Sequence, residues 1–195
     1  MVDLPSTRFV TMEFGLERDD TAMRREDGSE VVIQRRGPRW RTTLEPAATR
    51  GASARAWRSF LAQLSTYEET VEVGPPEYDG PSTGYSGPAP QVDGADQLGT
   101  SLDCDGVTAD EDILEEGDYL EVNGELKILT ADATADGTGA VTFEFRPALR
   151  EPPDDDAAVE INDPVATFRR REPEGVWSLD RVLITRVSLE LVETF

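Results

Sequence analysis

The sequence predicts a mainly β protein, made of a β-sandwich-like domain with one short amphipathic helix and an inserted small β-barrel or sandwich domain. Three observations support this fold class. Apolar and polar residues alternate in many short runs, a single segment has helical spacing, and a stretch rich in proline and glycine separates the two parts. The chain has 195 residues, 37% hydrophobic and 30% charged, so it is globular in composition and long enough for two small cores.

The clearest β pattern lies between Glu115 and Arg150. Apolar and polar residues alternate there in three runs, at 119–123, 126–130 and 141–146. Asn123-Gly124 predicts a two-residue hairpin turn, because both residues tolerate a positive φ, and 136–139 predicts a looser turn. We therefore expect three consecutive antiparallel strands. Pro147 should end the third one, because proline lacks the N–H that a strand ladder uses.

The first part of the chain predicts strands at 8–15, 31–34, 40–44 and 70–73. Residues 16–30 are charged and poor in apolar side chains, so we expect a surface loop that turns at Asp27-Gly28. Ser53 predicts the N-cap of a helix that runs to about residue 64. Apolar residues at helical spacing predict one buried face of this helix: Ala54, Trp57, Phe60, Leu61 and Leu64.

Large apolar side chains in these elements are the candidate core or interface residues. They are Trp40, Trp57, Phe60, Leu61, Leu64 and Trp177. For Trp40, a place in the core or at an interface is favoured over stacking on a ligand.

A domain boundary is predicted in the segment from Gly74 to Gly94, which is rich in proline, glycine and small polar residues. The second domain then covers 75–171, including strands expected at 157–161 and 165–170. Residues 177–195 alternate as one long strand that is expected to return to the first domain. The predicted domains are therefore 1–74 with 172–195, and 75–171 as an insertion.

Charge is the unusual part of the composition, with a formal net charge of -21. Only Lys127 is lysine among the 19 basic residues. Dense negative charge with arginine in place of lysine is similar to proteins of salt-loving organisms, where salt screens repulsion, and an acidic protein with arginine-biased codons is the alternative. Residues 1–60 hold 11 arginines and 9 acids, a balance of +2, which leaves -23 for the rest. Such charge excludes free nucleic acid as a ligand of the later part.

The composition also excludes several kinds of chemistry. The absence of histidine excludes Ser/His/Asp and Cys/His nucleophiles and histidine zinc sites, and a lone Cys104 excludes an intrachain disulfide. Two segments are candidate calcium sites: the cluster of acids at 103–112, and Asp132 to Gly137, which resembles the start of an EF-hand loop. That loop lacks the acid at its third position and has Phe143 where the bidentate Glu belongs. Forty acids also guarantee accidental carboxylate pairs. We therefore expect no metal, no cofactor and no enzymatic activity.

No export signal or membrane-spanning run is recognisable, so the sequence predicts a protein made in a cytoplasm without membrane insertion.

Several segments carry a family resemblance: "PRWRTTLEP", "ARAWRSFLAQLSTYEETVEV", "GDYLEVNG", "ADGTGAVTFEFRPALR" and "PVATFRRR". In this order they resemble tail-tip proteins of long-tailed viruses, in the distal tail or minor tail group. The segments lie within 38–74 and 115–171, about half of the chain. The resemblance implies a six-fold, ring-forming adaptor in the virion, assembled in the cytoplasm of a halophilic host. Its partners would be itself, the tail tube and the hub or receptor-binding proteins.

An alternative function is a carbohydrate-binding module or minor tail protein that contacts the host surface through Tyr78, Tyr85 and Tyr119. The position of these tyrosines discriminates the two functions. Clustered, exposed tyrosines would favour sugar binding, whereas burial or scatter would favour the adaptor.

Overall fold

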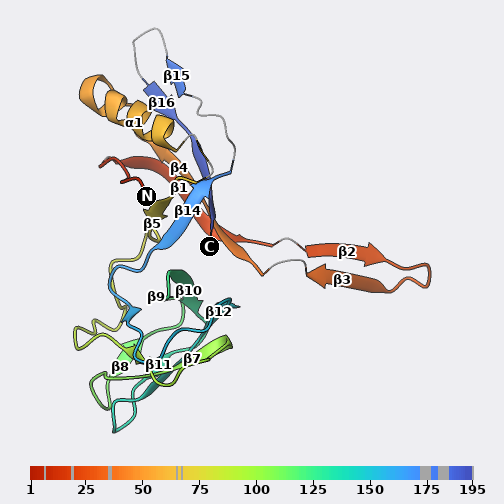
Figure 1. The fold of residues 1–195 in the computed structure, drawn as a ribbon, viewed down its shortest axis with the longest axis vertical. Coiled ribbons are helices and arrows are strands. Elements are labelled where there is room, and N and C mark those ends of the chain that lie inside the picture. Colours follow the sequence, from red (N-terminus) through yellow and green to blue (C-terminus); the bar gives the residue numbers. More distant parts are fainter. Residues whose placement is uncertain are drawn as a thin grey trace. The chain divides into compact units, whose positions relative to one another are not determined.

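The computed structural model describes most of residues 1–195. Its description leaves out 7, 19, 35–36, 65, 67, 172–176, 180–184 and 195, and gives only the backbone at 20–21, 32–34, 177, 179 and 185. Strands make up 44% of the structure and helix 8%, which confirms the predicted mainly β fold. Figure 1 follows the elements along the chain.

The chain divides into two compact units. The first unit consists of Met1–Glu72 with Thr167–Phe195, and the second unit, here called the insertion, is Val73–Ala166. The strand predicted at 165–170 was expected in the second domain, but the strand there belongs to the sheet of the first unit. Its alternation is the same in either sheet, so the pattern alone could not assign it.

A five-stranded sheet forms the first unit, in the order β1-β4-β17-β14-β5. The strands are β1 (Phe9–Glu17), β4 (Arg39–Pro46), β17 (Leu189–Glu193), β14 (Ala166–Arg170) and β5 (Val71–Val73). β1 pairs with β4, and β4 with β17, both antiparallel, and β17 pairs in turn with β14. The sheet curves into half of a barrel.

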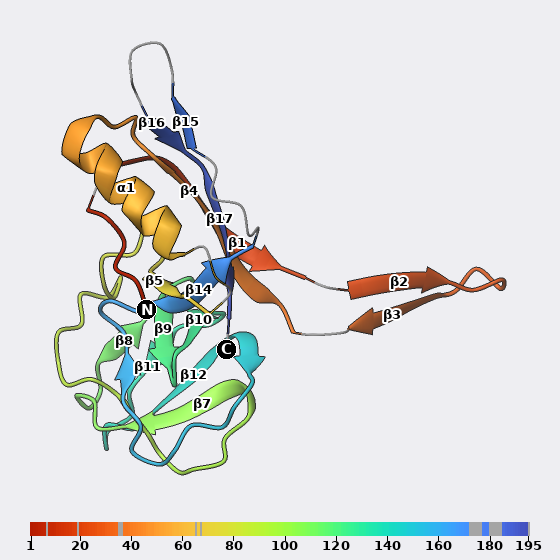
Figure 2. The same ribbon diagram turned by 45° about the horizontal axis from the view of Figure 1, so that its top comes forward.

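One face of this sheet is apolar and packs on a helix. Along β4 every second residue is buried, including Trp40 and Leu44, while the residues between them are partly exposed. Figure 2 shows helix α1 (Gly51–Gln63) lying beside β4. Trp57 of α1 meets Phe9 of β1 edge to face, with 6.2 Å between ring centroids. The predicted amphipathic helix is therefore present, with its apolar face in the core.

The predicted cap of this helix is wrong. The helix begins at Gly51, the N-cap position is Arg50, and no side chain caps it. Ser53 lies inside the first turn and is exposed. Gly51 takes a positive φ of 60°, and that conformation lets the chain enter the helix two residues before the serine.

Residues 20–34 form a β-hairpin, whereas a surface loop was expected over 16–30. Strand β2 (Asp20–Arg24) pairs antiparallel with β3 (Glu30–Gln34), from Arg24 opposite Glu30 to Asp20 opposite Gln34. The expected turn at Asp27-Gly28 is present, with Gly28 at a φ of 84°. Cross-strand hydrogen bonds need no apolar alternation, so an exposed ribbon of charged residues escapes a pattern search.

The long C-terminal strand was also an incorrect prediction. Strand β15 (Trp177–Leu179) turns back and pairs with β16 (Thr185–Val187), and β17 follows. Residues 180–184 of the predicted strand lie outside the described residues. Each arm of a hairpin alternates like part of a single strand, so the pattern does not reveal where the chain turns back.

A six-stranded sheet builds the insertion, in the order β13-β9-β10-β12-β7-β6. Its strands are β6 (Gln91–Val92), β7 (Gly99–Asp105), β9 (Tyr119–Val122), β10 (Glu125–Leu129), β12 (Val141–Leu149) and β13 (Val159–Glu160). A small sheet joins β8 (Asp112–Leu114) to β11 (Ala133–Thr134). Gln91 of β6 forms a β-bridge with Ala158, which precedes β13, so the two edge strands nearly close a barrel.

The predicted three-strand core of the insertion is confirmed. β9 pairs with β10 through the Asn123-Gly124 turn, with φ values of 53° and 74°, and β10 pairs with β12. β12 nevertheless continues past Pro147 to Leu149, so the expected strand end is wrong. The pairing of β12 with β7 shifts register between Glu144 and Leu149, and a bulge there places proline where no ladder N–H is needed.

Removal of the insertion should leave the first unit folded. β5 and β14, the strands that flank the insertion, are neighbours in one sheet, so a short glycine linker from Val73 to Ala166 can join them. The expected result is a cooperative melting transition and retention of the helical circular dichroism signal of α1. An unfolded product would show that the five-stranded sheet depends on the insertion.

Candidate interaction site

Five of the six candidate core or interface side chains are described, and these five lie in the core of the first unit. Trp40 is 3% exposed, Trp57 0%, Phe60 2%, Leu61 2% and Leu64 1%. The side chain of Trp177 lies outside the described residues, although its backbone belongs to β15. These residues therefore hold the unit together, and interaction surfaces have to be sought elsewhere.

The three tyrosines of the insertion are structural. Tyr85 is 7% exposed and Tyr119 8%, and Tyr78 packs edge to face on Tyr119 at 5.5 Å between centroids. The hydroxyl of Tyr78 donates to the carbonyl of Ile161 at 2.7 Å, and burial raises the pKa of Tyr78. The hydroxyl of Tyr85 donates to Pro88 O at 2.9 Å. These rings fasten the loop at 75–90 to the barrel.

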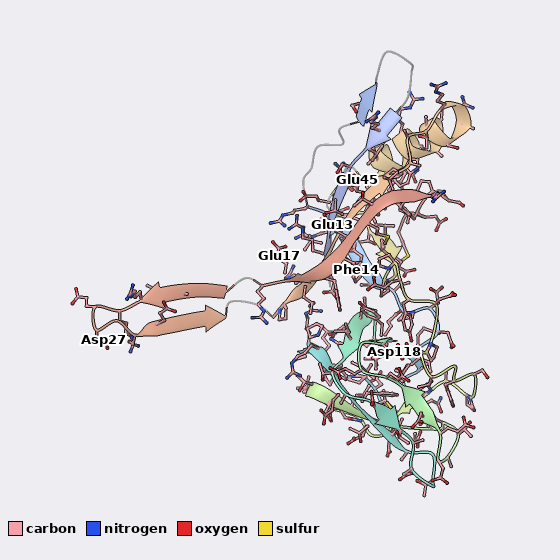
Figure 3. The ribbon with its side chains drawn as sticks, turned by 180° about the vertical axis from the view of Figure 1, so that it is seen from behind. Glu13, Phe14, Glu17, Asp27, Glu45 and Asp118 are labelled. Atoms are coloured by element: carbon pink, nitrogen blue, oxygen red, sulfur yellow. The ribbon has the colours of Figure 1, made fainter. Side chains whose placement is uncertain are left out.

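Two carboxylates of the insertion hold turns together. Asp136 Oδ1 accepts hydrogen bonds from Thr138 N, Thr138 Oγ1 and Ala140 N, at 2.8, 2.6 and 3.0 Å. The bond from the Thr138 hydroxyl is the largest cause that lowers the pKa of Asp136. Asp118, labelled in Figure 3, accepts from Ser82 N, Ser82 Oγ and Glu115 N and is 3% exposed. Among the described residues, no three acids are placed to hold a metal ion together.

The only lysine of the chain is buried in an ion pair inside the insertion. Lys127 Nζ lies 2.5 Å from Glu125 Oε2, with side-chain exposures of 0% and 6%, and donates to Ala148 O at 3.1 Å. Glu125 also accepts from the backbone N–H groups of Arg150 and Glu151. β10 and the end of β12 hold this polar cluster in place, and no local sequence pattern indicates it.

Cys104 on β7 is an inert core residue. Its side chain is 1% exposed, and burial, with the aspartates at 103, 105 and 93, raises the pKa of the thiol to about 12. The thiolate is the reactive form, so this cysteine is not a nucleophile at neutral pH.

The sheet of the first unit presents its polar face away from α1. Along β4 the partly exposed residues are Arg39, Arg41, Thr43 and Glu45. Arg41 Nη2 lies 3.4 Å from Glu190 Oε2 on β17. The acidic residues of this surface include Glu13 and Glu17 on β1 and Glu45 on β4, which are labelled in Figure 3. This face is therefore a mixed charged surface.

Arginines gather at the end of this face, in a pocket of about 290 Å³ that we call the arginine pocket. Its lining residues are Glu17, Arg18, Gly37, Arg39, Arg169, Arg171 and Val192. They come from four neighbouring strands and from residues just beyond the ends of these strands. Glu17 of β1 is opposite Arg39 of β4, and Val192 of β17 is opposite Arg169 of β14. Arg171 Nη1 pairs with Glu17 Oε1 at 3.0 Å. Four of the seven lining residues are therefore arginines, and Glu17 is the acid among them.

This pocket was not among the predicted sites, although three of its four arginines stand in two conspicuous runs, "RRGPRWR" and "FRRR". These runs become neighbours only because β17 lies between β4 and β14. A search for basic runs on strands could have found the residues but not their convergence.

Among the described residues, no helix is both long and apolar enough to cross a bilayer.

The chain matches none of the protein-family models, and a search of curated proteins finds no match.

Proposed function

We propose that the chain is a structural subunit of a viral tail tip, a ring-forming adaptor that links the tail tube to hub or receptor-binding proteins. The proposal combines the resemblance of about half of the sequence to distal tail proteins with surfaces of the first unit that suit self-association. In this role the protein acts by contact rather than by catalysis. Its place would be the virion tail, after assembly in the cytoplasm of a halophilic host.

The hairpin of β2 and β3 is the observation that carries the proposal. Among the described residues these strands pair only with each other, and the side chain of Met23 is 57% exposed. β3 nevertheless has three consecutive apolar β-branched residues, Val31 to Ile33. A two-stranded ribbon alone is marginal in water, so in this role the hairpin gains stability by lying on another protein surface.

The edge of the five-stranded sheet supports the same function. β1 is the edge strand, nine residues long, with Val10 72% exposed and Leu16 38% exposed. A long edge with apolar side chains is open to pairing with another chain. A second copy would cover both this edge and the hairpin, and identical contacts repeated by rotation close a ring.

The carbohydrate-binding alternative has less support. It requires exposed tyrosines on one face, whereas Tyr85 and Tyr119 are buried and the hydroxyls of Tyr78 and Tyr85 are bound to backbone carbonyls. By the criterion set out from the sequence, burial of these rings favours the adaptor.

Native mass measurement with a hairpin variant tests the proposal. Glu17 and Arg39 lie opposite each other on the neighbouring strands β1 and β4. Residues 20–34 can therefore be replaced by a short glycine-serine turn without opening the sheet. We expect the full chain to be a closed oligomer in molar salt that loosens at low salt, where its net charge of -21 repels over a longer distance. The variant should be monomeric and keep its melting temperature within a few degrees.

Two outcomes would contradict the proposal in different ways. A full chain that stays monomeric at every salt concentration would remove the ring. An oligomer of unchanged size in the variant would show that the hairpin is not the contact.

A further inference from the structure

The turn between β9 and β10 places an asparagine side chain next to an unhindered backbone nitrogen. Asn123 and Gly124 form this turn, and Val122 pairs with Glu125 across it. Both turn residues are exposed. A Cβ placed on Gly124 would meet no atom of the described residues within 4 Å. Water therefore reaches both residues of the turn.

We propose that Asn123 is a site of spontaneous deamidation and that opening of the β9–β10 turn controls its rate. The backbone nitrogen of Gly124 attacks Cγ of Asn123, and the new C–N bond closes a succinimide ring. The side-chain NH2 group leaves as ammonia, together with the proton that the backbone nitrogen gives up. Water then adds to either ring carbonyl and breaks its C–N bond, so the product is aspartate or isoaspartate. Water is the only co-reactant, and the reaction requires no partner of the chain.

The residue that follows an asparagine determines how readily the ring closes. The chain has two asparagines, Asn123 and Asn162, and both are exposed. Gly124 has no Cβ, so its nitrogen can approach the amide closely. Asn162 is followed by Asp163, whose side chain hinders the attack and whose charge disfavours the negative charge that develops on the backbone nitrogen. Asn162 is therefore a control within the same molecule.

The folded turn keeps the reacting atoms of Asn123 and Gly124 apart. Their φ values of 53° and 74° are those of a type I′ turn, in which ψ of the first residue is about 30°. Ring closure requires the nitrogen of Gly124 to lie on the same side of the Cα–C bond of Asn123 as Cβ. A ψ in this range instead places that nitrogen almost trans to Cβ. The turn must therefore open before the reaction can proceed.

The isoaspartate product would prevent the same turn from forming again. Isoaspartate adds an atom to the backbone, whereas the two-residue turn sets the register of β9 and β10. That register places Lys127 opposite Leu120 on β9. The aspartate product keeps the original backbone, and Asp-Gly also suits a type I′ turn. Only isoaspartate is therefore expected to impair refolding of the insertion.

Ageing of the full chain, folded and in urea, tests the inference. Both samples are kept at the same mildly alkaline pH, salt concentration and temperature, and deamidation is located by peptide mass spectrometry. In urea, Asn123 should react several times faster than Asn162. In the folded chain, Asn123 should react at least about tenfold more slowly than in urea, because a turn that is open for about a tenth of the time can react only during that fraction.

Asn123→Asp is the matched control. It has the backbone of the aspartate product but lacks the amide that leaves as ammonia, while the Asp-Gly pairs elsewhere in the chain remain. After ageing in urea and dilution into buffer, the wild type should lose recovery of its folded circular dichroism signal in proportion to isoaspartate at 123. An isoaspartate-specific methyltransferase measures that product. The control should recover more of its signal than the wild type.

Two results would overturn the inference. Deamidation of Asn162 as fast as that of Asn123 in urea would show that Gly124 does not make Asn123 the reactive site. Equal rates at Asn123 in the folded and the unfolded chain would show that the turn does not control the reaction.

Discussion

Replacement of Trp57 by alanine is expected to lower the free energy of unfolding of the first unit by about 3–5 kcal/mol, as large-to-small changes in cores do. The indole is 0% exposed and meets Phe9 and Phe60 edge to face, at 6.2 and 5.5 Å between centroids. Its removal leaves a cavity between α1 and the sheet, which the backbone of a packed helix cannot fill.

Denaturant unfolding followed by circular dichroism measures this loss, and two variants serve as controls. Arg55→Ala changes an exposed position of the same helix and should shift stability by no more than about 0.5 kcal/mol. Trp57→Phe should cost less than the alanine change, because it keeps an aromatic ring and removes an indole N–H that has no partner among the described residues. Equal losses in Trp57→Ala and Arg55→Ala would show that Trp57 does not belong to the core.

Replacement of Lys127 by methionine is expected to destabilise the insertion by about 3 kcal/mol, because it removes the buried cation beside Glu125 and leaves that carboxylate only the more distant, partly exposed Arg150, at 3.7 Å. Lys127 Nζ lies 2.5 Å from Glu125 Oε2, and the lysine is 0% exposed. Methionine is close to lysine in length, so the loss reports mainly on charge rather than on volume.

The double variant Lys127→Met with Glu125→Gln separates charge from packing. It removes both charges, and glutamine keeps an acceptor for the N–H groups of Arg150 and Glu151. We expect its loss of stability, measured by denaturant unfolding, to be smaller than that of Lys127→Met alone. A double variant that is less stable than either single variant would contradict this account of the pair.

Elements formed by local rules were predictable from the sequence. The Asn123-Gly124 turn depends on two residues that accept positive φ, and α1 depends on five apolar residues at helical spacing. Both are complete within a short stretch of chain. The residues that determine each element are close together in the sequence, so a local pattern is enough to predict it.

Features that depend on distant strands were not predictable in this way. β14 alternates like a strand of the insertion, yet it pairs with β17 beyond it in the chain. The arginine pocket arises from the register of four strands, and the Lys127 pair from the end of β12 past Pro147. Alternation shows which side chains share one face of a strand, but it does not show which strand lies next to it. A site formed by side chains of several strands therefore cannot be predicted without knowing the order of the strands in the sheet.

The uneven distribution of basic residues also determines where trypsin, which cleaves after lysine and arginine, can cut the chain. Within the insertion the only such residues are Lys127, Arg146 and Arg150. Lys127 is buried, and Arg146 precedes Pro147, a bond that trypsin does not cleave. The third bond, after Arg150, has both flanking N–H groups hydrogen-bonded to Glu125. Trypsin therefore finds its sites almost entirely in the first unit, and the barrel is protected by composition as well as by folding.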